Sequence, residues 1–75
     1  MFIIESELGG QSTQLGEPVA SIPIAIEVAA ERANLARSIA GSAPPFRLLN
    51  EGNPLSEAEA TEWQAGAAAN GFGTY

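Results

Sequence analysis

The stretch SIPIAIEVAAERANLARSIAGS, Ser21 to Ser42, carries the longest periodic pattern in this 75-residue chain. Ser21 is a good helix cap, and Pro23 falls in the first turn, where its missing N–H costs nothing. Gly41 suits the left-handed position that follows a helix, and two prolines come shortly after it. The sequence therefore predicts a helix from Ile22 to Ala40.

At about 100° per residue, this predicted helix has two apolar stripes. The bulky stripe consists of Ile24, Val28, Leu35 and Ile39. The smooth stripe beside it consists of Ala25, Ala29, Ala33, Ala36 and Ala40, flanked by Ile22 and Ile26. Together they cover roughly 200° of the helix, which is more than one core contact needs. The alanines are interpreted either as helix filler, since alanine has the highest helix propensity, or as a second contact surface where another helix approaches closely.

A second helix is predicted from Glu57 to Ala69. Ser56 and Glu59 have the spacing of a capping box, and Asn70-Gly71 supplies a stop signal. Trp63 is the one large apolar residue among many alanines, so it is expected to dominate the docking of this helix.

Two further segments have strand character. Residues 2 to 8 alternate between apolar and polar, as in a half-buried strand, and Gly9-Gly10 ends the pattern. Residues 11 to 17 are polar and are predicted to form a loop. Residues 46 to 49 have the composition of a short strand, and whether they pair with residues 2 to 8 stays open.

These elements predict one small domain of residues 1–75 with a mainly α fold, a small α+β fold being the alternative. Its parts are an N-terminal strand and loop (1–20), a first helix (21–41), a proline-containing connection (42–55), a second helix (56–70) and a glycine and aromatic tail (71–75).

The composition excludes several classes of function. The charged residues are nine glutamates and three arginines, which give a net charge of −6, and there is no Asp, Lys, His or Cys. Three scattered arginines do not supply the basic surface that nucleic acid requires. Without His or Cys, disulfides are impossible and no metal site is predicted. No cofactor is predicted either.

No uncharged stretch approaches the roughly 20 residues that span a bilayer, so no membrane span is predicted. A basic segment followed by an apolar run, as in a signal peptide, is also missing. The expected location is inside a cell or within a virion.

The chain is predicted not to be an enzyme. His, Cys, Lys and Asp supply most general bases and nucleophiles, and none of them occurs here. Glu57, Glu59 and Glu62 form the densest acidic group, but at helical spacing they diverge. They are interpreted as a solvated N-terminus matched to the helix dipole.

The apolar surface instead predicts protein partners, in a homo- or hetero-oligomeric assembly. Phe72 and Tyr75 lie in a glycine-jointed tail and are interpreted either as folding back on their own chain or as anchors in a neighbour. The predicted partner-binding residues are Phe2, Ile4, Ala25, Ala29, Ala33, Ala36, Trp63, Phe72 and Tyr75.

Two functions are therefore expected from the sequence. The first is a non-catalytic structural subunit that packs into a larger complex, such as a virion accessory protein of the capsid-cement or head-to-tail-joint kind, by class-level analogy. The alternative is an acidic regulator, an inhibitor or adaptor, that binds a basic surface on a target protein.

Overall fold

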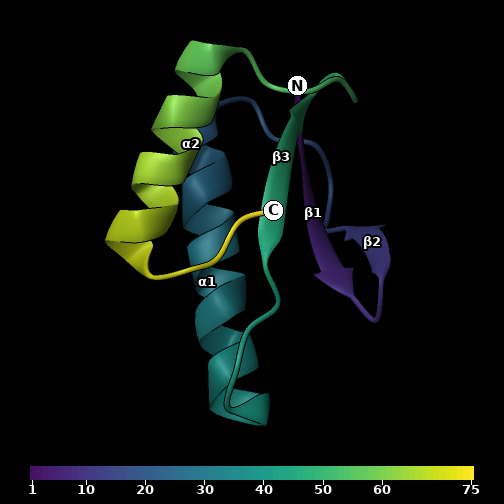
Figure 1. The fold of residues 1–75 in the computed structure, drawn as a ribbon, viewed down its shortest axis with the longest axis vertical. Coiled ribbons are helices and arrows are strands. Elements are labelled where there is room, and N and C mark those ends of the chain that lie inside the picture. The colour runs from purple at the N-terminus through teal and green to yellow at the C-terminus, as the bar shows by residue number, and fades with distance from the viewer.

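The computed structural model describes all of residues 1–75 as an antiparallel sheet covered by two helices on one face (Figure 1). The elements are β1 (Phe2–Leu8), β2 (Gln11–Gln14), α1 (Ile22–Ala40), β3 (Phe46–Asn50) and α2 (Glu57–Asn70). Three strands and two helices together make this a small α+β fold. The expectation of a mainly α fold is wrong, because two strands that were predicted as a loop and as an undecided segment complete a sheet around β1.

The β1–β2 hairpin corrects the prediction of a loop at residues 11 to 17. Leu8 pairs with Gln11, so the turn consists of Gly9 and Gly10 alone. Their φ angles are 62° and 83°, and positive φ at both central residues is what a tight type I′ hairpin turn requires. All four residues of β2 are exposed, so the strand has no apolar alternation by which a sequence pattern would reveal it.

β3 answers the question that the sequence left open, because it pairs antiparallel with β1 along its whole length. The sheet order is β2-β1-β3. Ile4 pairs with Leu48 on the face that carries the helices, and Glu5 pairs with Arg47 on the opposite face. The alternation of β1 therefore predicted its two faces.

Both helices begin and end where their local signals predicted, within one residue. Ser21 Oγ accepts a hydrogen bond from the N–H of Ile24, and Gly41 ends α1 with a φ of 81°. The capping box of α2 is present in both directions between Ser56 and Glu59. α2 extends to Asn70, one residue beyond the prediction.

The core lies between the sheet and the helices and is centred on the smooth stripe of α1. Ala25, Ala29 and Ala33 are each 0% exposed. The bulk comes from other elements, since Ile4, Phe46, Leu48, Trp63 and Phe72 are also buried. The Phe72 ring lies 5.7 Å from the Phe46 ring, edge to face, and 5.2 Å from the Trp63 ring. Trp63 is 3% exposed, as its predicted role in docking α2 requires.

Gly66 marks the place where α2 approaches α1 most closely. A Cβ atom on Gly66 would lie 2.7 Å from Ile26 Cγ1 and still nearer to Cδ1. Such a contact forces the Ile26 side chain to move. Gly66 therefore lowers helix propensity in α2 but permits close packing with α1.

We predict that Gly66→Ala does not stabilise the protein, although alanine is the better helix former by about 1 kcal/mol. Overpacking against Ile26 costs about 1 to 3 kcal/mol, so the free energy of unfolding in urea should fall or stay level. In an Ile26→Ala background the clash is absent, and Gly66→Ala should then raise that free energy by about 1 kcal/mol. Equal stabilisation in both backgrounds would contradict the close approach of the two helices.

Candidate interaction surfaces

Most of the residues that the sequence assigned to a partner lie inside the chain's own core. Ile4, Ala25, Ala29, Ala33, Trp63 and Phe72 are all buried. Phe2 and Ala36 are half-buried, and Tyr75 is 45% exposed. Of the two interpretations of the smooth stripe, helix filler or a close contact surface, the structure shows a close contact surface. The elements that cover it belong to the same chain. The fold brings six of the nine residues together in one core, where they pack against other elements of the same chain.

The C-terminal tail also returns to its own chain. The N–H of Phe46 donates to the carbonyl of Gly73 at 2.9 Å, and the N–H of Tyr75 donates to the carbonyl of Phe46 at 3.3 Å. These bonds place the tail parallel to the free edge of β3, where Phe46 bridges to Thr74. Figure 1 shows this path, in which the tail runs from the end of α2 back to β3. Phe72 therefore folds back on its own chain, which is the first of the two interpretations of the tail.

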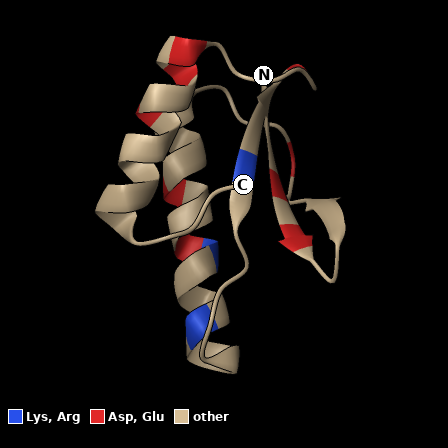
Figure 2. Ribbon diagram, viewed as in Figure 1, with Lys and Arg blue, Asp and Glu red and all other residues tan.

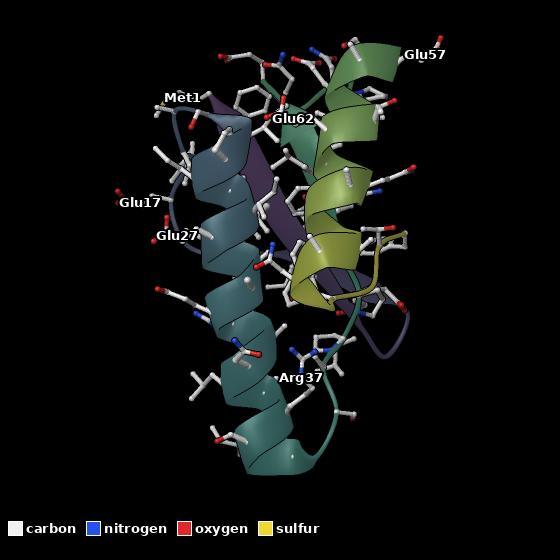
Figure 3. All side chains as sticks on the ribbon, turned by 90° about the vertical axis from the view of Figure 1, so that its left-hand side faces the viewer. Met1, Glu17, Glu27, Arg37, Glu57 and Glu62 are labelled. Atoms are coloured by element: carbon white, nitrogen blue, oxygen red, sulfur yellow. The ribbon has the colours of Figure 1, made fainter.

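The bulky stripe of α1 supplies three of the exposed large hydrophobic residues of the chain. Ile24, Leu35 and Ile39 are 46%, 53% and 77% exposed. Val28 is half-buried and borders a shallow hollow of about 260 Å³ together with Leu35, Glu31 and Arg32. Figure 3 shows α1 and α2 side by side in front of the sheet. The sequence pattern contained the stripe but did not indicate which of the two stripes faces the core.

The face of the sheet away from the helices carries one organised polar cluster. Arg47 Nε donates to Glu5 Oε1 at 2.7 Å, and Arg47 Nη2 lies 2.6 Å from the same oxygen. The guanidinium carbon lies 5.3 Å from the centre of the Tyr75 ring, and the Tyr75 hydroxyl is 2.8 Å from Ser12 Oγ. The hydrogen bond with Glu5 raises the pKa of Arg47, so this arginine stays charged and engaged within the chain.

A second hollow lies between β3, the first turns of α2 and the tail. Its volume is about 530 Å³. It is lined by Arg47, Leu48, Leu49, Pro54, Leu55, Ala60, Trp63, Gln64, Thr74 and Tyr75. We call this hollow the β3 groove. No combination of residues in the sequence pointed to it, because four separate segments form its walls.

The glutamates are spread over the chain. Figure 2 shows them distributed over β1, both helices and the connecting segments. No three acidic residues come close enough to hold a metal ion together. Within the acidic group at the start of α2, Glu59 is taken up by the helix cap: its carboxylate accepts from Ser56 N at 2.9 Å and from Asn50 Nδ2 at 3.0 Å.

The candidate surfaces are thus the bulky stripe, the β3 groove and the outer polar cluster. No known protein family, curated protein or solved structure matches this chain. No helix combines the length and apolar character that crossing a membrane requires. The function must therefore be argued from these surfaces.

Glu59 should make stability depend on pH. The hydrogen bond from the Ser56 backbone is the main cause of a lowered pKa at Glu59, with the Ser56 and Asn50 side chains adding to it. A carboxyl whose pKa is lower in the folded state stabilises the protein above the unfolded pKa of about 4.3. That contribution is lost as pH falls through the lowered folded pKa.

We therefore predict that Glu59→Gln loses less stability than the unmodified protein on acidification through this range, measured by urea unfolding at a series of pH values. Gln also fits a capping box, so the variant should fold. Glu62→Gln is the matched control, because Glu62 is exposed on the same helix and, unlike Glu59, its carboxylate takes no part in the helix cap. Identical pH dependence in the two variants would contradict the assigned role of Glu59.

Proposed function

We propose that this protein is a non-catalytic structural subunit, which packs into a larger protein assembly through the bulky stripe of α1. The observation that carries the proposal is the exposure of Ile24, Leu35 and Ile39 along one side of a four-turn stretch of helix. Apolar side chains that stay exposed along one side of a helix indicate a surface for protein association. A side of a helix that is apolar but uncovered is incomplete without a neighbour.

The small size of the chain supports the same function. A chain of 75 residues buries only about 60% of the surface exposed by its unfolded form, so partner contacts add a large share of its stability. Three of the eleven buried residues on which the core is built are alanines of α1, which bury little area each. The proposal stays at the level of an assembly subunit, because no feature of the fold singles out a virion among assemblies.

An acidic regulator is the second candidate from the sequence. It would need the negative charge gathered on one face, to meet a basic surface on its target. The distribution of the glutamates over separate elements does not favour it (Figure 2).

The proposal predicts that the isolated chain associates with itself to cover the stripe. Sedimentation and thermal melting over about a hundredfold range of concentration should give a mass and a melting temperature that rise with concentration. The double variant Leu35→Glu, Ile39→Glu should stay monomeric with an unchanged circular dichroism spectrum, because both side chains are exposed.

The matched control carries Ala68→Glu and Ala69→Glu, two exposed positions on α2 that lie outside the stripe. It adds the same charge and should associate like the unmodified protein. A monomer with a sharp, concentration-independent melt would contradict the proposed function. Association that disappears equally in both double variants would show that charge, rather than the stripe, controls it.

A further inference from the structure

The free edge of β3 has one residue whose backbone is unpaired. In an antiparallel pair, alternate residues direct their N–H and C=O groups toward the neighbouring strand. Arg47 and Leu49 bond to β1 in this way, whereas Phe46 bonds outward to the tail. By this alternation Leu48 directs its N–H and C=O away from β1, as Phe46 and Asn50 do, and no backbone hydrogen bond outside the sheet and helices involves either group.

This unpaired residue is buried and lines the β3 groove. Leu48 is 4% exposed, and it lines the groove with Leu55, Trp63 and Tyr75. Buried backbone donors and acceptors are almost always paired, since leaving them unpaired costs free energy. A donor and an acceptor on one residue, side by side in a groove, match the N–H and C=O of another extended chain.

The same edge already binds two extended segments of this chain on either side of Leu48. The tail bonds to Phe46, and the N–H and C=O of Asn50 both bond to Asn53 at 2.8 Å. Phe46 and Asn50 are about 13 Å apart along the strand, which leaves space for a segment of about three residues. The neighbouring contacts therefore indicate what kind of group completes the edge: extended peptide backbone.

The walls of the groove indicate the side chains that such a segment carries. Leu55, Ala60 and Trp63 supply an apolar wall from α2 and the segment before it. No carboxylate side chain lines the groove, and its one arginine is held by Glu5. An apolar side chain entering between β3 and α2 meets no unpaired charge.

We propose that the β3 groove binds a short extended peptide segment with apolar side chains, by adding it to the edge of β3 at Leu48. The central residue of the segment exchanges two backbone hydrogen bonds with Leu48 in the antiparallel manner. This binding is separate from the association through α1, because the groove and the bulky stripe share no residue.

The test uses a capped tripeptide, acetyl-valyl-leucyl-valinamide, titrated into the full chain labelled with ¹⁵N. The amide resonance of Leu48 should shift and its hydrogen exchange should slow, because the peptide accepts its hydrogen bond. The same peptide methylated on the leucine nitrogen cannot donate to the Leu48 carbonyl and should bind about fivefold more weakly. Ala60→Trp fills the groove and should abolish the shifts.

Ala68→Trp is the matched control, because Ala68 is exposed on α2 and does not line the groove. It should bind the tripeptide like the unmodified protein, and circular dichroism checks that both tryptophan variants are folded. No binding of the tripeptide would overturn the proposal. Equal binding of the methylated peptide, or binding that Ala60→Trp leaves intact, would overturn it as well.

Discussion

The close contact of the smooth stripe of α1 with β1 and α2 is the constraint on which the rest of this fold depends. Ala25, Ala29 and Ala33 expose nothing, and their small side chains allow the helix backbone to approach its neighbours. The space that a larger side chain on α1 would occupy is filled from the other side by Phe46, Trp63 and Phe72. Gly66 extends the same principle to α2, where the absence of a side chain admits Ile26.

This contact determines what lies on the surface. Once the alanines face inward, the helical period places Ile24, Leu35 and Ile39 outward, and no element of the chain reaches them. The tail, in contrast, packs into the core, because the Phe72 ring supplies side-chain volume that the alanines of α2 lack. Its residues Gly73 and Tyr75 bond to Phe46, and Thr74 and Tyr75 form one wall of the β3 groove. The bulky stripe and the β3 groove are thus both consequences of α1 packing with its alanine side toward the core.

The sequence predicted the helices well because their boundaries depend on local chemistry. Ser21, Gly41 and the Ser56–Glu59 capping box each act within a few residues. It underestimated the strands, since the four exposed residues of β2 have no apolar pattern and are held by the geometry of the Gly9-Gly10 turn. The one available signal for β2 was the Gly9-Gly10 pair, because two glycines between two short segments are typical of a β-hairpin.

Local sequence signals could not predict which side of α1 faces the core. Bulk favours burying Ile24, Val28, Leu35 and Ile39, while close approach favours burying the alanines. The outcome depends on the rings of Phe46, Trp63 and Phe72, which lie outside this helix. The predicted partner residues were therefore mostly core residues. The exposed stripe and the groove became visible only when the whole fold was assembled.

The most direct test of this account is to compare two single substitutions on α1 by urea unfolding, at a concentration low enough to keep the chain monomeric. Ala29→Leu should lower the free energy of unfolding by about 1 to 3 kcal/mol, because the helix is held close to its neighbours there. Leu35→Ala should change it by less than about 0.5 kcal/mol, because that side chain faces solvent. The reverse order, with Leu35→Ala the more damaging change, would mean that α1 buries its bulky stripe and would contradict the account.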